Sequence, residues 1–292
     1  MWALPALGAA LLASFNPILY KRLLTQASPI VVVWSVLGLA LPLLTLSTLA
    51  STPTWPGVDG VFLLATTGSA MLNALAHLAS ARSLQSTDAS LVAPLLTFSP
   101  AFTVLLSALF LGETPGIRGL LGVGLVLLGA YWLNHGPGDR GRVPFQALAL
   151  KPGVGLVLLA GLMWAITPVF EKLAIQHTFP TSSRFTALVV TGLIVILLTP
   201  FALRHVLQGG SPDLNSLIHR REWLLATSIA GIAPAFGYTA MSLGPVGYVT
   251  TLFRLSAVFT VIWSAWLLRE PGFRQRLPAS LLMVTGAVLI AV

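Results

Sequence analysis

Three ionisable side chains lie well inside apolar stretches of the sequence, namely His77, Glu171 and Arg254. Such groups are costly in a membrane and usually face a cavity or a partner. Glu171 lies about six residues before the end of its stretch and Arg254 about seven after the start of its own, so both would lie roughly 10 Å deep from one side. We expect an ion pair between them, which either locks two helices or takes part in binding a solute or a proton. Alternatively, Glu171 reaches the membrane interface beside Lys172.

Further polar residues stand at helical spacing or beside prolines. Asn73 and His77 are four residues apart and would share a helix face, where they either line a polar cavity or bond a neighbouring helix. Pro17, preceded by Asn16, and Pro168, one turn after Trp164, each remove a helical hydrogen bond and predict a kink. The kinks are either hinges or static bends. Four aromatic residues either contact a solute or, alternatively, pack against helices or face lipid: Phe98, Phe236, Tyr238 and Tyr248.

These observations give the candidate functional residues. The substrate-binding candidates are Asn16, Asn73, His77, Phe98, Trp164, Phe236, Tyr238 and Arg254, the coupling or structural ion pair is Glu171 with Arg254, and the hinges are Pro17 and Pro168.

Several classes of chemistry find no support in the sequence. There is no phosphate-binding G-x-x-x-x-G-K-[ST] motif, no H-E-x-x-H and no G-x-S-x-G, and cysteine is absent. We therefore expect no enzyme activity, no cofactor and no metal site. The formal net charge is +8, but the basic residues are scattered among short segments between apolar stretches. That pattern is typical of membrane topology signals and not of nucleic-acid binding.

The elements that position these residues are membrane helices. Only 8% of the 292 residues are charged and 56% are hydrophobic, whereas soluble domains carry about a quarter charged residues. A bilayer core takes roughly 20 apolar residues in a helix. Ten such segments are predicted, at 2–20, 30–49, 60–82, 90–111, 117–134, 153–176, 184–204, 222–242, 247–268 and 277–292.

The chain contains an internal repeat. When the sequence is shifted by 157 positions, residues 89–113 align with 246–270 with 10 identities in 25 positions, where roughly two or three would occur by chance. We predict a first five-helix unit at 1–138, a connecting loop at 139–151 and a second unit at 152–292. Because five is odd, the second unit starts on the opposite side of the membrane. The two repeats are therefore expected to be inverted, an arrangement typical of secondary transporters.

Lysine and arginine predict the orientation. Twelve of these residues fall in one set of loops and three in the opposite set. The positive-inside rule places the twelve in the cytoplasm and both termini outside.

The repeated stretch also carries a family resemblance. It reads Val92-x-Pro94-Leu95-x-x-Phe98-Ser99-Pro100-x-Phe102 and ends in Phe110-Leu111-Gly112-Glu113, followed by a glycine-rich segment that closes on Leu128-Gly129. This pattern resembles the drug/metabolite transporter superfamily and, within it, the ten-helix EamA-type exporters. The resemblance covers nearly the whole chain and implies export. Many relatives keep both termini in the cytoplasm, opposite to the charge count.

The sequence as a whole therefore predicts an all-α membrane protein with ten transmembrane helices in two inverted repeats. Its expected function is secondary transport of a small metabolite or amphipathic compound by alternating access around a central cavity. A non-transporting membrane scaffold or sensor is the alternative. The expected partners are a small-molecule substrate and the lipid bilayer, with no nucleic acid and with a monomer or homodimer as the assembly. Transport is either coupled to protons, through Glu171 or His77, or is facilitated exchange without a coupling ion. The expected location is the bacterial inner membrane.

Overall fold

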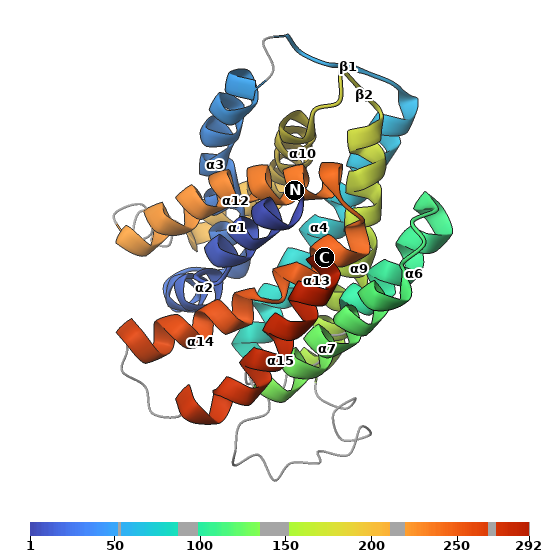
Figure 1. The fold of residues 1–292 in the computed structure, drawn as a ribbon. Helices are drawn as coiled ribbons and strands as arrows, with labels where there is room; N and C mark the ends of the chain where they lie inside the picture. Colours follow the sequence, from blue (N-terminus) through green and yellow to red (C-terminus); the bar gives the residue numbers. More distant parts are fainter. Residues whose placement is uncertain (52–53, 87–98, 135–151, 211–219, 268–272, 292) are drawn as a thin grey trace.

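The computed structural model describes residues 1–51, 54–86, 99–134, 152–210, 220–267 and 273–291. These residues form a bundle of α-helices joined at one end by a small antiparallel sheet (Figure 1). The elements in chain order are α1 Ala3–Ala13, α2 Asn16–Leu24, α3 Pro29–Ser51, β1 Gly57–Val58, α4 Gly60–Ser86, α6 Ser99–Leu111, α7 Ile117–Asn134, α9 Pro152–Gln176, β2 Thr178–Phe179, α10 Ser183–His205, the π-helix η1 Val206–Gly210, α12 Arg221–Leu243, α13 Val246–Phe253, α14 Ser256–Leu267 and α15 Phe273–Ala291.

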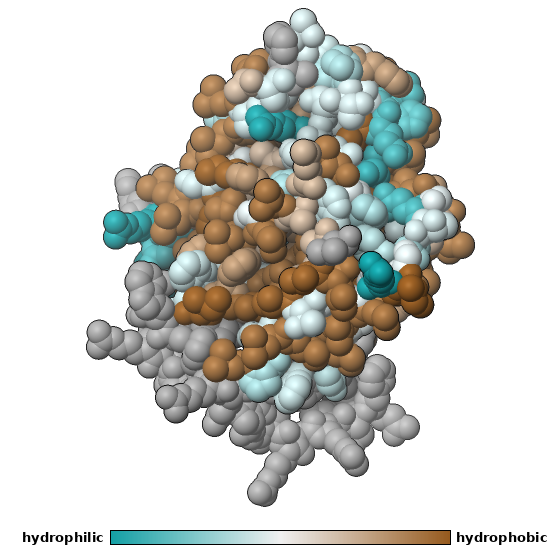
Figure 2. All heavy atoms as spheres, in the orientation of Figure 1, coloured by the Kyte–Doolittle hydropathy of each residue, from teal (hydrophilic) through white to brown (hydrophobic). Residues whose placement is uncertain are grey.

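The helices have the length and composition of membrane spans. Among the described residues, six are long and apolar enough to cross a bilayer, at Ala3–Leu24, Pro29–Ser51, Gly60–Ser83, Leu158–Gln176, Ser183–Gln208 and Arg221–Leu243. Shorter apolar helices lie at Ser99–Leu111, Ile117–Trp132, Val246–Thr260 and Leu277–Ala291. The face shown in Figure 2 is mostly hydrophobic, with hydrophilic residues in patches near the top and at the sides. An all-α integral membrane protein is confirmed, whereas the count of ten helices stays a prediction.

Two segments predicted as single helices are divided. The segment 2–20 becomes α1 and α2, which part at Ser14 and Phe15, and 247–268 becomes α13 and α14, which part at Arg254 and Leu255. Two side chains of α14 hydrogen-bond Ser14 at the break between α1 and α2. Thr260 Oγ1 donates to the Ser14 carbonyl oxygen at 2.9 Å, and Trp263 Nε1 donates to Ser14 Oγ at 3.1 Å. The first bond satisfies a carbonyl group that a continuous helix would have used internally.

The two predicted hinge prolines have different surroundings. Pro17 falls in the first turn of α2, after the break, where a proline lacks no hydrogen bond that the helix needs. Pro168 lies inside α9, which continues to Gln176. The break at Ser14 and Phe15 lies in the turn that precedes Pro17, where a proline disturbs a helix, whereas α9 continues past Pro168.

Among the described helices, α4 and α9 make the most extensive contact and lie side by side (Figure 1). At one end β1 pairs with β2, and His177 Nδ1 contacts Asp59 Oδ2 at 2.7 Å. At the other end Ser83 Oγ donates to the Gly153 carbonyl oxygen at 2.8 Å. Asp59 also accepts from Phe62 N at 2.9 Å as the N-cap of α4. The bond from Phe62 N and the one with His177 hold the pKa of Asp59 below its ordinary value.

Some contacts between the two halves of the chain occur in exchanged pairs. Thr103 Oγ1 donates to the Ala165 carbonyl oxygen at 3.0 Å, and Thr260, its equivalent at an offset of 157, makes the corresponding bond to Ser14 of the other half. Ser14 and Ala165 are themselves equivalent at an offset of 151. Each half thus donates the same threonine hydroxyl to the first long apolar segment of the other.

Glycines at the contact of α7 with α15 repeat this exchange. A Cβ atom on Gly286 would lie 2.6 Å from the Gly122 carbonyl oxygen, and one on Gly129 would lie 2.8 Å from the Ala279 carbonyl oxygen. The offset of 157 converts the first contact into the second. Only glycine permits backbones to approach this closely.

Candidate functional site

A buried carboxylate lies where α4, α9 and α12 meet. Glu171 of α9 is 7% exposed and its Oε1 accepts from Ser69 Oγ at 3.0 Å and from Asn73 Nδ2 at 3.0 Å, both on α4. The hydroxyl of Tyr238, on α12, also hydrogen-bonds this carboxylate. Asn73 Nδ2 contacts Ser69 Oγ at 3.2 Å, so the two donors hold each other in place. We call Ser69, Asn73, Glu171 and Tyr238 the Glu171 cluster.

The donors around Glu171 are neutral. Among the described residues, no lysine, arginine or histidine forms an ion pair with its carboxylate. A carboxylate away from water is costly unless hydrogen-bonded, and here three donors supply those bonds. The arrangement has the chemistry to take up a proton or to bind a cationic group of a solute, because either would neutralise the buried charge.

The expected ion pair between Glu171 and Arg254 is not formed. Arg254 lies at the break between α13 and α14, and its Nη2 donates to Ser99 Oγ at the start of α6. Glu171 instead faces α4 and α12. The two charges were placed at similar depth from sequence, but depth does not fix the direction in which a side chain leaves its helix.

The remaining candidates fall in several places. His77 lies two turns along α4 from Ser69, and its ring meets Trp164 edge-on with centroids 5.6 Å apart. This contact belongs to the interface of α4 with α9, about one turn from Asn73 of the Glu171 cluster. It brings together His77 and Trp164, which the sequence indicated as separate candidates.

Three candidates lie apart from that interface or outside what the structure describes. Phe236 is 41% exposed, and its ring lies against Gly8 of α1. Because it is two residues from Tyr238, it projects from the other side of α12. Asn16 is the partly buried first residue of α2. Phe98 lies outside the described residues.

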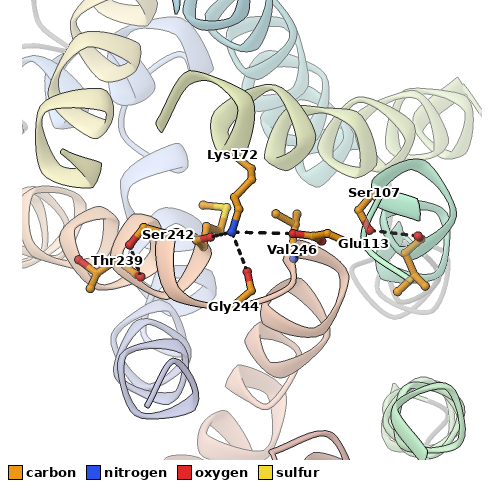
Figure 3. Close-up of polar contacts among 9 residues, drawn as sticks. Ser107, Glu113, Lys172, Thr239, Ser242, Gly244 and Val246 are labelled. Atoms are coloured by element: carbon orange, nitrogen blue, oxygen red, sulfur yellow. Dashed lines mark hydrogen bonds and ion pairs between the residues drawn. The ribbon is translucent and has the colours of Figure 1, made fainter. Parts of the chain in front are cut away.

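A second polar cluster surrounds Lys172, the residue after Glu171. Its Nζ donates to the carbonyl oxygens of Met241 and Gly244, the latter at 3.0 Å, and lies 3.8 Å from Glu113 Oε1. Glu113 Oε2 accepts from Val246 N at 2.7 Å. Figure 3 shows the lysine extending from α9 toward the turn between α12 and α13, with Glu113 on its far side. We call Glu113, Lys172, Met241, Gly244 and Val246 the Lys172 cluster.

The Lys172 cluster binds the ends of two helices. Lys172 places a cation at the last carbonyl groups of α12, and Glu113 places an anion at the first free N–H of α13. Both placements complement the helix dipoles. Glu113 directly follows a predicted helix, where its carboxylate is unfavourable to the dipole of that helix, so its position in the sequence indicates a partner elsewhere. Its partner α13 is remote in sequence, so the pairing could not be found from spacing.

A small cavity adjoins the Lys172 cluster. It has a volume of about 120 Å³ and is lined by Val104, Ser107, Glu113, Thr114, Pro115, Pro245, Gly247 and Tyr248. Within the described part of the chain, no group of three or more His, Cys, Asp or Glu residues could hold a metal ion.

Comparison with known proteins identifies a family. The model of the EamA-like transporter family matches residues 1–135 and 151–292. An uncharacterized transporter of Helicobacter pylori is 27% identical over 142 residues, which are 48% of this chain and 45% of that protein. An uncharacterized transporter of Methanothermobacter thermautotrophicus is 24% identical over 205 residues, 70% of this chain and 56% of that protein. The match therefore spans about half the length of these two relatives.

The chain is also similar to a protein named as an efflux pump and to a protein of known structure. A putative manganese efflux pump, MntP, of Saccharophagus degradans is 25% identical over 138 residues, 44% of this chain and 74% of that protein. A protein of known crystal structure superposes with a TM-score of 0.72 over 99% of this chain and 95% of its own, at 18% sequence identity. This structural likeness concerns the fold alone.

Proposed function

The chain belongs to the EamA-like transporter family, and from that membership we propose that it is a secondary transporter that exports a small metabolite or amphipathic compound by alternating access. The family and the transporter-named relatives favour transport over a scaffold, sensor or enzyme. The proposed architecture is ten membrane helices in two inverted repeats. Two sets of equivalent contacts between the halves support this architecture. They are the bonds of Thr103 to Ala165 and of Thr260 to Ser14, and the close approaches of Gly286 to Gly122 and of Gly129 to Ala279.

The observation that supports the mechanism best is the buried carboxylate of Glu171. It lies between α4 of the first half and α9 and α12 of the second, and it is held by neutral donors. Transporters of inverted repeats bind solute and coupling ion between the repeats. We assign Glu171 to the proton or to a cationic group of the solute, with Asn73 and Tyr238 as its hydrogen-bonding neighbours. His77 and Trp164 extend the proposed binding region along α4 and α9.

The decisive experiment is a flux assay with purified protein in proteoliposomes. A panel of amino acids, sugars, cationic drugs and Mn²⁺ is offered with and without a proton gradient. The manganese arm is included because one relative is named a putative manganese efflux pump. We expect movement of an organic solute that responds to the gradient and a Glu171→Gln variant that loses this response. Absence of flux for every solute, or an unchanged response in the variant, would refute the proposal.

Location and orientation are part of the same proposal. We place the protein in a bacterial inner membrane, as a monomer or homodimer, with both termini outside. Because the sequence contains no cysteine, single cysteines at Pro56 and Ser211 can report orientation by labelling with an impermeant maleimide in intact cells. Labelling at Pro56 with protection at Ser211 is expected, and the reverse would overturn the orientation.

A further inference from the structure

The Lys172 cluster joins the two halves of the chain. Glu113 belongs to the first half, whereas Lys172, Met241, Gly244 and Val246 belong to the second. Around these residues the end of α6, the last turns of α9, the end of α12 and the start of α13 meet (Figure 3). Lys172 lies one turn before the end of α9. Lys172 directly follows Glu171 in α9, so the two clusters lie at nearly the same position along this helix.

The opposite end of α12 also carries a contact between the halves. Arg22 Nη1 of α2 lies 3.1 Å from Glu222 Oε1 in the first turn of α12. Arg220 Nη2 donates to Gln26 Oε1 at 3.0 Å beside it. With 23 residues in α12, the two contacts are roughly 30 Å apart, about the thickness of the bilayer core. The structure thus holds both ends together across the two halves.

The two contacts differ in burial. The side chains of Lys172 and Glu113 are 11% and 17% exposed, whereas those of Arg22 and Glu222 are 61% and 25% exposed. An exposed ion pair stabilises little, because water and salt screen it. Removing one partner of a buried pair is far more costly. Loss of one partner is therefore more costly at the Lys172 cluster than at the contact of Arg22 with Glu222.

We propose that the Lys172 cluster is a gate that closes the transport pathway at the end of α9 nearest Glu171, and that opening requires Lys172 to separate from Glu113 and from the end of α12. The proposal rests on the transport function proposed above and adds a residue role to it. Alternating access needs contacts between the halves that break at one end at a time. Lys172 meets this need because it binds Glu113 and the α12 carbonyl groups through one ammonium group.

The test is a distance measurement by spin labelling, which uses the absence of native cysteine. Labels on cysteines at Thr114, after α6, and at Leu243, 58% exposed at the end of α12, report opening of the gate. Glu113→Gln keeps an oxygen that can accept from Val246 N–H but removes the charge that faces Lys172. We expect the ratio of open to closed populations to rise about tenfold in this variant, because Lys172 loses the charge partner that it has in the closed state.

The matched control is Glu222→Gln, which removes the exposed ion pair at the other end of α12. It should leave the distance between Thr114 and Leu243 unchanged. Lys172→Met removes the charge and both carbonyl contacts, so it should open the gate further than Glu113→Gln if it folds. A distance distribution in folded Glu113→Gln equal to that of the wild type overturns the gate, whatever Lys172→Met does.

The measurement needs no solute, so its outcome is separate from the flux assay. If the distance increases in Glu113→Gln but the wild type shows no flux, the Lys172 cluster does hold this end closed, and the proposed transport function is refuted. If the wild type shows flux but the distance does not increase in Glu113→Gln, the transport function stands and the gate is refuted.

Discussion

Replacement of Glu171 by glutamine and by alanine should have sharply different consequences. Glutamine keeps an oxygen at the position that accepts from Ser69 and Asn73, and its amide can donate to the hydroxyl of Tyr238. Only the charge is lost. We therefore expect the stability of Glu171→Gln to remain within about 1 kcal/mol of the wild type.

Alanine removes the acceptor for all three donors. Ser69 is 0% exposed and Asn73 is 9% exposed, so water cannot replace the lost partner freely. An orphaned buried donor costs roughly 1–3 kcal/mol, and two such donors give roughly 2–6 kcal/mol before relaxation. With a shift of about 2–4 °C per kcal/mol for a chain of this order of size, the unfolding midpoint should fall by roughly 4–24 °C.

The assay is thermal unfolding of both purified variants in the same detergent, followed by flux measurement. Glu171→Gln should unfold near the wild-type temperature and still lose the response to a proton gradient. Equal destabilisation by glutamine and alanine would show that the charge itself holds the helices together. Full gradient-dependent flux in the stable glutamine variant would show that the carboxylate takes no part in coupling.

Three further predictions test the packing and the end of the α4 and α9 pair. Gly286→Ala should lower the unfolding midpoint because the new Cβ would lie 2.6 Å from a backbone oxygen of α7, at a cost of about 1–3 kcal/mol. The control is Gly124→Ala, whose Cβ would have nothing within 4 Å and which should be neutral. Equal effects of the two variants would contradict the close contact. Thr103→Val and Thr260→Val should each destabilise the protein by about 1 kcal/mol, because each variant loses an equivalent bond to the opposite half. A large difference between the two destabilisations would argue against the equivalence of these bonds. The pKa of Asp59 is lowered from 3.8, chiefly by the bond from Phe62 N and then by His177. The stabilisation that Asp59 contributes to the fold is therefore present above that pH and is lost as the pH falls through the lower folded value. On acidification in this range, the unfolding midpoint of the wild type should drop more than that of Asp59→Asn, and parallel pH profiles would contradict the prediction.

The sequence by itself determined the class of protein and its division into similar halves. Low charge and long apolar segments can be satisfied only by helices in a membrane, because lipid offers no partner to a free backbone group. The recurrence of Ser99, Phe102 and Thr103 at Ser256, Phe259 and Thr260 depends on residue identity alone. The division into units at 1–138 and 152–292 stays a prediction.

The sequence also identified part of the candidate site. Asn73, His77, Trp164, Glu171 and Tyr238 stand out because polar or aromatic groups are rare in apolar segments, and the structure brings them to the contacts of α4, α9 and α12. Helical spacing correctly placed Asn73 and His77 on one face, because neighbours at four residues share a face in any helix.

Only the tertiary structure decided which of these groups meet. Glu171 and Lys172 are adjacent, but a helix turns by about 100° per residue, so one faces α4 and the other faces Glu113 and the end of α12. The sequence gives the depth of a side chain along its helix but not the rotation of that helix against its neighbours. For that reason the ion pair of Glu171 with Arg254 was predicted and the one of Lys172 with Glu113 was not. The rotation is set by contacts remote in sequence, such as Gly122 against Gly286 and Thr103 against Ala165.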